Sequence, residues 1–252
     1  SVNKLDDSYL KAKKIKQIDE WIVQAAGIHF AGSTNRGTIA QGDAMNIKTE
    51  FIVRSPVHVA SLKLSIGEKD TVLKESVVPY KRVNWNHTQQ VRQSITQPYW
   101  LVNTKETGHF VVKDQEKIGQ AAPDPALLVH AFLTIEGEKL QISRPIQELI
   151  IDPVKGEYSQ PIAITPRSIF QINHPNILLP KGSGDSKSFE IQIKAMGAIA
   201  SGKVDVLNQA GTRLGTLDLP EGLAMGMSQN VSITVREKDQ KFDGKETWKL
   251  QL

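Results

Sequence analysis

The stretch of sequence that decides the fold class reads Leu127-Leu128-Val129-His130-Ala131-Phe132-Leu133-Thr134-Ile135. Every odd position in it is apolar, which is the period of a β-strand that buries one face. Similar alternation or short apolar runs recur at residues 45–53, 62–66, 110–112, 140–142 and 146–151. Short strands at regular spacing predict a β-sandwich over residues 28–152. His130 falls on the opposite face, where we expect water or a polar partner.

A second set of strand-like segments follows Asp152. Its members are residues 162–164, 169–172, 189–193, 204–207, 214–217, 231–235 and 248–252. Between the two sets, Asp152-Pro153-Val154-Lys155-Gly156-Glu157 interrupts the strand pattern with proline and glycine, so we place a hinge there. A second sandwich is therefore predicted over residues 153–252. The chain is expected to be mainly β, with two tandem immunoglobulin-like β-sandwich domains.

The head of the chain, residues 1–27, has a different period. Its apolar residues recur every three or four positions, at Leu5, Tyr9, Ala12, Ile15, Ile18, Ile22 and Ala25. This spacing predicts one amphipathic α-helix before the first sandwich, with Gly27 as its left-handed C-terminal stop. An apolar stripe of this kind needs a surface to cover it. That surface is either the following domain or a domain that precedes the helix.

Composition excludes several classes of protein. The 252 residues carry 31 Lys and Arg against 27 Asp and Glu, a net charge of +4, and the charges are dispersed. No Arg-rich stripe with interleaved aromatic residues is present, so we expect no nucleic-acid partner. No apolar run approaches the roughly 20 residues of a membrane span, so none is expected. The absence of cysteine excludes disulfides, thiolate zinc sites and cysteine nucleophiles.

The residues that could carry catalysis are scattered. None of the six histidines lies three or four residues from another, whereas zinc sites usually contain one such pair. His174-Pro175-Asn176 is followed by no carboxylate, and no Gly-Xaa-Ser-Xaa-Gly elbow occurs. We therefore expect no catalytic, cofactor-binding or metal-binding residue in this chain, and no enzyme. A hydrolase built from carboxylates on different strands stays open as a remote alternative.

Three aromatic residues are candidates for ligand binding. Trp85 lies in a polar stretch, and Tyr99-Trp100 follows Pro98. Exposed aromatic rings on a β-sandwich can stack on sugar rings, with Asn, Arg and His side chains bonding the hydroxyls. We name Trp85, Tyr99 and Trp100 as the glycan-binding candidates. The alternative is that Trp100 belongs to the core and that Trp85 covers a strand edge.

Several short motifs resemble the non-catalytic β-rich region of long bacterial proteins of the PIG-L (LmbE-like) deacetylase family. They are Ile95-Thr96-Gln97-Pro98-Tyr99-Trp100-Leu101, Ile118-Gly119, Arg144-Pro145-Ile146, Asp152-Pro153-Val154-Lys155-Gly156-Glu157 and Pro161-Ile162. The helix that ends near Gly27 is similar to the segment that joins the family's catalytic domain to its β-domains. The resemblance covers residues 5–166 and weakens beyond them.

The resemblance implies an accessory role. It implies that a zinc-dependent N-acetylglucosaminyl deacetylase domain precedes this segment in the same polypeptide, and that zinc belongs to that domain alone. The segment would then serve as a scaffold that also helps to hold a glycan or glycolipid. The expected location is the cell envelope of a bacterium, periplasmic or secreted. The alternative function is a free-standing carbohydrate-binding or adhesion module that uses the three aromatic residues.

Overall fold

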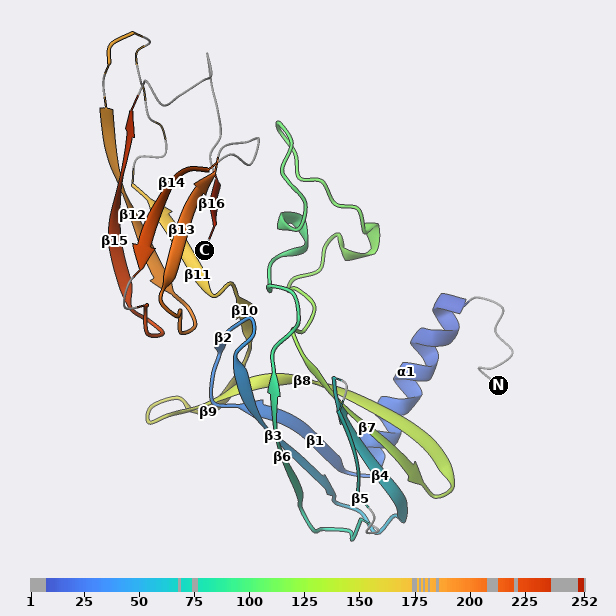
Figure 1. Ribbon diagram of the computed structural model, residues 1–252. Helices are drawn as coiled ribbons and strands as arrows, with labels where there is room; N and C mark the ends of the chain where they lie inside the picture. Colours follow the sequence, from blue (N-terminus) through green and yellow to red (C-terminus); the bar gives the residue numbers. More distant parts are fainter. Residues whose placement is uncertain are drawn as a thin grey trace. The chain divides into compact units, whose positions relative to one another are not determined.

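The computed structural model describes residues 8–67, 69–73, 77–173, 176, 178, 180, 182–184, 186–207, 213–219, 222–236 and 249–251. By its internal contacts the chain divides into two compact units (Figure 1). Unit 1 comprises Ser1–Thr38 and Ala44–Ile164, and unit 2 comprises Ile39–Asp43 and Thr165–Leu252. The predicted hinge stretch is a hairpin turn in which Asp152 pairs with Gly156.

Unit 1 begins with the predicted helix, α1 (Ser8–Ala25). Gly27 follows it with a φ of 60°, the left-handed conformation that glycine adopts without steric cost. The amide of Gly27 donates to the carbonyl oxygen of Gln24 at 3.0 Å, which closes the last turn. The predicted helix and its stop signal are therefore confirmed, while Leu5 lies outside the described residues.

The body of unit 1 is one eight-stranded sheet, drawn as a curved layer in Figure 1, with the order β5-β4-β7-β8-β1-β3-β6 and with β9 also paired to β8. Its strands are β1 (Ile28–Thr34), β3 (Ala44–Val53), β4 (Val59–Ile66), β5 (Lys69–Leu73), β6 (Val83–Gln90), β7 (Leu128–Ile135), β8 (Glu138–Asp152) and β9 (Gly156–Pro161). The predicted alternation is confirmed, because its apolar positions in β3, β4 and β7 are buried. His130 points to the other face of β7, where Nδ1 lies 2.8 Å from the Ser143 hydroxyl.

The two halves of this sheet are joined by β8, which is 15 residues long. Its first half pairs antiparallel with β7 as far as Pro145, and its second half pairs parallel with β1 and antiparallel with β9. Pro145 has no N–H to contribute to a ladder, so the change of partner falls where a hydrogen bond is already missing. Unit 1 is therefore one continuous sheet whose two halves share β8.

Unit 2 is built from two three-stranded sheets, β11-β12-β15 and β14-β13-β16. Their strands are β11 (Ser168–Ile172), β12 (Ser186–Ala195), β13 (Gly202–Leu207), β14 (Arg213–Leu219), β15 (Ser228–Arg236) and β16 (Lys249–Gln251). Both sheets contribute to one small core, which contains Ile191 and Ile193 from β12 and Val204 and Val206 from β13. The mainly β class with one N-terminal helix is thus confirmed.

The short strands β2 (Thr38–Ala40) and β10 (Ala163–Thr165) pair with each other. Within unit 2, Arg167 fastens the inserted segment 39–43. Its guanidinium donates to Asp43 Oδ1 at 2.9 Å, to the Gln41 carbonyl at 3.3 Å and to the Ala198 carbonyl at 2.6 Å. The buried Ile39 and Ala40 complete this attachment.

Candidate functional site

The long connection between β6 and β7, which we call the β6–β7 loop (residues 91–127), holds two of the three candidate aromatic residues. Tyr99 and Trp100 lie in a single 3-10 turn, η2 (Tyr99–Leu101), which closes when the Leu101 amide donates to the Pro98 carbonyl at 2.9 Å. A second short turn, η3 (Gln115–Lys117), follows. Connections this long with little regular structure are uncommon in compact domains and often carry function.

Hydrogen bonds fix the loop from within and to the body of unit 1. The Thr96 amide donates to the Ile164 carbonyl at 2.9 Å, and the Ile164 amide donates to the Thr96 hydroxyl at 3.0 Å. Asn103 Nδ2 donates to the Val111 carbonyl at 2.9 Å, which ties the outgoing arm to the returning arm. These bonds hold the loop in one shape, although no residue from 92 to 126 is fully buried.

The residues of the β6–β7 loop line a cavity of about 470 Å³ that is open to solvent. Its apolar surface comes from Tyr99 and from aliphatic or proline side chains, and amide side chains line it as well. The lining residues are Gln93, Ser94, Ile95, Thr96, Gln97, Tyr99, Val102, Asn103, Val112, Lys113, Asp114, Lys117, Gln120, Pro123, Asp124, Pro125 and Ala126. This volume lies within the usual range of small-molecule sites, roughly 300–1,000 Å³.

Charges around the cavity balance each other. Lys117 Nζ donates to Asp124 Oδ2 at 2.6 Å, and this bond together with the nearby carboxylate raises the pKa of Lys117. Asp114 Oδ1 accepts from the Glu116 amide at 3.2 Å and so caps η3. With Lys113 the lining contains two ammonium groups and two carboxylates, and therefore no net charge.

Tyr99 is held in place within the lining. Its phenol oxygen accepts a hydrogen bond from the Gly119 amide at 3.1 Å. Its ring meets the Trp100 ring edge-on, at a centroid distance of 4.9 Å and an interplanar angle of 88°. Trp100 itself is 36% exposed and is not part of the lining. The structure thus brings these two candidates together and places only Tyr99 in the cavity.

Trp85 lies elsewhere, on β6 at an edge of the sheet. It pairs with the buried Thr49 of β3, so its half-buried side chain lies on the face of the sheet that carries the core. Its ring stacks on the His87 ring at 5.3 Å. Trp85 does not line the cavity. The role of Trp85 in glycan binding stays a prediction.

Sequence reasoning named the aromatic residues and missed the amides that accompany Tyr99. Gln93, Gln97, Asn103 and Gln120 line the cavity, and none of them belongs to a motif. The strand predicted at residues 110–112 was wrong, because these residues lie inside the β6–β7 loop without regular structure. The available signal was the weak strand alternation over the other residues between β6 and β7. His174, Pro175 and Trp248 lie outside the described residues.

A second candidate surface is the outward part of α1. Apolar side chains there are exposed, with Tyr9 at 67% and Trp21 at 64%. The others are Leu10, Ile15 and Ile18; we call these five residues the α1 apolar set. In Figure 1 the start of the helix points away from the sheet of unit 1. Four lysines lie among them along the helix, at Lys11, Lys13, Lys14 and Lys16.

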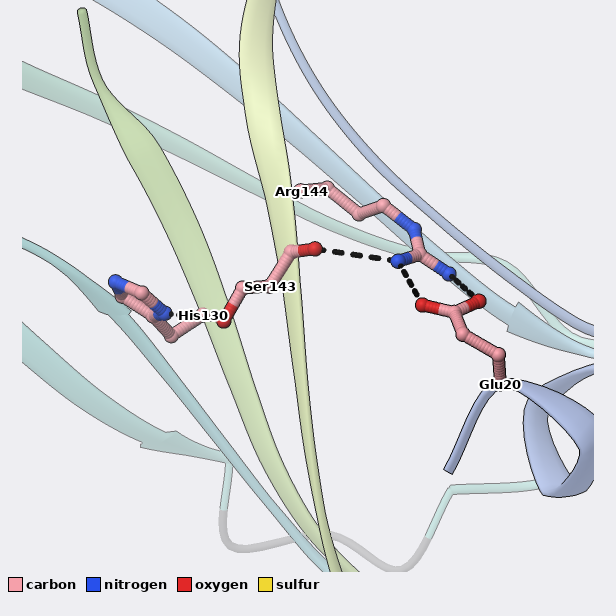
Figure 2. A network of polar contacts seen from close by, with 4 residues as sticks. All are labelled: Glu20, His130, Ser143 and Arg144. Carbon is pink, nitrogen blue, oxygen red and sulfur yellow. Dashed lines mark hydrogen bonds and ion pairs between the residues drawn. The ribbon is translucent and has the colours of Figure 1, made fainter. Parts of the chain in front are cut away.

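Only the last turns of α1 are fastened to the sheet. Figure 2 shows Arg144 of β8 reaching Glu20 with two hydrogen bonds, of 2.7 Å and 2.9 Å. This interaction lowers the pKa of Glu20, while burial and the adjacent Glu20 carboxylate raise the pKa of Asp19. Val23 and Ala26 are buried against the body of unit 1. The helix is therefore anchored at its end, while the α1 apolar set is exposed.

Across the part of the chain that the structure describes, no three His, Asp or Glu side chains are grouped so that they could hold a metal ion. Among these same residues, no helix has the length and apolar character needed to cross a membrane. No protein-family model matches the chain, and a comparison with curated proteins finds no match either.

Proposed function

We propose that this chain is the non-catalytic accessory region of a larger PIG-L-type N-acetylglucosaminyl deacetylase, and that it docks the catalytic domain through α1. One observation carries the proposal. The five residues of the α1 apolar set are exposed, although Glu20, Val23 and Ala26 hold the end of the same helix on the sheet. Several exposed apolar side chains on one helix are typical of a surface that a partner covers.

The attachment of the end of α1 to the sheet favours a docking role for this helix over that of a free N-terminal segment. A helix of 18 residues, about 27 Å long, is marginal in water by itself and gains most of its stability from packing. The Glu20–Arg144 pair fixes the direction in which α1 leaves the sheet. The partner surface that fits best is an apolar groove with acidic side chains on its rim, because lysines lie between the exposed apolar residues.

The remaining parts of the proposal follow from the resemblance. Zinc would belong to the catalytic domain, and the protein would act in the cell envelope of a bacterium. We also infer that both units are variants of the immunoglobulin-like sandwich. The shared core of the two sheets in unit 2 and the alternating burial in unit 1 support this reading.

The test combines a mass measurement with site-specific cross-linking in the source cells. A photoreactive amino acid replaces Trp21, and a matched control replaces Val154, which is 93% exposed in the β8–β9 turn. We expect a native polypeptide several times heavier than 27.9 kDa and cross-links from position 21 to peptides outside this sequence. A native species of 27.9 kDa, or equal cross-linking from both positions, would overturn the proposal.

A second candidate function is a carbohydrate-binding module. The observation that favours it is the cavity of the β6–β7 loop, which is lined by the ring of Tyr99 and by several amide side chains. This function is compatible with the accessory role, because a region that holds a glycan can assist a catalytic domain. It does not depend on α1, which contributes no residue to the lining. A glycan screen on the chain tests it separately.

A further inference from the structure

We infer that the cavity of the β6–β7 loop binds a neutral saccharide, and that Tyr99 with the amides of Gln97, Asn103 and Gln120 forms the site. This inference rests on the second candidate function and gives it a location. In this site Tyr99, and not Trp85, is the aromatic residue that contacts the ligand. It is independent of the docking of α1, whose residues lie outside the cavity.

The ligand class follows first from charge. The lining contains Lys113, Lys117, Asp114 and Asp124, and Lys117 and Asp124 neutralise each other at 2.6 Å. A phosphate, a uronic acid or a sulfated sugar would meet these carboxylates without a surplus of cations, which costs affinity. A cationic ligand would meet the two ammonium groups. The lining therefore favours an uncharged ligand.

The second argument concerns the kind of uncharged ligand. The cavity combines the ring of Tyr99 and the aliphatic side chains of Ile95, Val102 and Val112 with amide groups. A sugar ring carries C–H groups on one face and hydroxyls around its edge, and so matches both kinds of surface. Side-chain amides have a donor and an acceptor, as a hydroxyl does, and the two groups can therefore bond in pairs. A purely apolar ligand would leave these amides without partners.

The third argument is preorganisation. Tyr99 is fixed by the Gly119 amide and by Trp100, and Asn103 is fixed by the Val111 carbonyl through its Nδ2. The start of the loop is tied to Ile164 by the reciprocal bonds of Thr96. Because these groups are already ordered, binding a ligand costs little conformational entropy. Trp100 acts as a positioning residue that supports the Tyr99 ring.

The experiment is a binding screen with the whole 252-residue chain. The probes are short neutral oligosaccharides of glucose, mannose, galactose and N-acetylglucosamine, with uronic-acid and sulfated oligosaccharides and a peptide array alongside. We expect weak binding of a neutral oligosaccharide, in the micromolar to millimolar range. Removing one amide by Gln97→Ala or Gln120→Ala should weaken it roughly threefold to tenfold per lost hydrogen bond.

Two further variants locate the site. Val112→Trp puts a much larger side chain into the lining and should weaken binding by narrowing the cavity, whereas Trp85→Ala should leave it unchanged. Thermal unfolding identifies a variant that fails to fold, and in that event the exposed Gln97 and Gln120 variants decide the question. Silence across the neutral panel, a preference for charged sugars or peptides, or saccharide binding that is unchanged in Val112→Trp would each overturn the inference. In the last case the module function would stand and only its site would be wrong.

Discussion

The attachment of α1 can be tested by removing the charge of Glu20. Glu20→Gln keeps the size of the side chain but removes its charge and one of the two oxygens that accept from Arg144 at 2.7 Å and 2.9 Å. The side chains are 38% and 28% exposed, so solvent screens the pair. An ion pair of this kind contributes about 0.5–1 kcal/mol. We expect the helix to detach from the sheet roughly twofold to fivefold more often.

The buried contact beneath the helix should matter more than the ion pair. Val23 is 5% exposed, and Val23→Ala removes two methyl groups from the contact. The loss is about 0.8 kcal/mol for each, and the cavity left behind brings the total to about 2 kcal/mol. That cost corresponds to roughly thirtyfold more frequent detachment. We therefore expect Val23→Ala to increase the detachment of α1 much more than Glu20→Gln does.

Hydrogen exchange of the α1 amides, read by mass spectrometry, measures this detachment directly. Lys117→Gln is the matched control, because it breaks the Lys117–Asp124 pair in the β6–β7 loop and should leave α1 unchanged. Equal exchange of α1 in the wild type and in Glu20→Gln would refute the role of the ion pair. A fall in overall thermal stability without faster exchange in α1 would refute the local attachment.

The same pair predicts a dependence on pH. Arg144 holds the pKa of Glu20 below its ordinary value of 4.5 in the folded protein. The pair therefore stabilises the attachment fully above pH 4.5, and this stabilisation is lost as the pH falls through the lowered pKa. After correction for intrinsic exchange rates, the difference between the wild type and Glu20→Gln should vanish in acid. A difference that persisted there would contradict the charge-based explanation.

Three more outcomes are expected. Gly32→Ala should destabilise unit 1 by about 1–3 kcal/mol, because its Cβ would lie 2.9 Å from a methyl group of Val129; a thermal unfolding curve like that of the wild type would contradict this. Arg167→Met should speed hydrogen exchange in segment 39–43 of unit 2, because Asp43 and two carbonyls lose their donor. The backbone amides that bond Asp152 lower the pKa of its carboxyl, so an NMR titration should find a value below 3.8.

Local periodicity explains which parts of the fold were predictable. The alternation around Val129 identified the buried face of β7, because a strand repeats every two residues whatever its neighbours are. Gly27 marked the end of α1 for an equally local reason, since its φ of 60° is readily available only to glycine. Neither feature depends on a distant residue, and the sequence therefore carried enough information for both.

A change of pairing strand along one long strand leaves no local pattern in the sequence. The runs at residues 140–142 and 146–151 looked like two strands separated by Ser143-Arg144-Pro145, and the structure makes them one strand, β8. The first half pairs with the neighbouring β7, but the second half also pairs with β1, which lies more than a hundred positions earlier in the chain. The placement of segment 39–43 in unit 2 is non-local in the same way, because it depends on Arg167.

In the candidate sites, too, the local features could be predicted from the sequence and the features that depend on distant residues could not. The apolar stripe of α1 could be read from its spacing, although only the structure shows that Val23 is covered while Trp21 is exposed. Among the residues that line the cavity of the β6–β7 loop, Tyr99 was recognisable from the sequence as an aromatic residue. Gln97 and Asn103 follow no sequence pattern, and only the folded loop brings them to the same cavity. The role of Trp85 could not be read from the sequence, because one tryptophan in a polar strand has the same local sequence whether it faces a ligand or covers the edge of a core. A prediction of binding from aromatic residues therefore needs the strand register before it can separate these two roles.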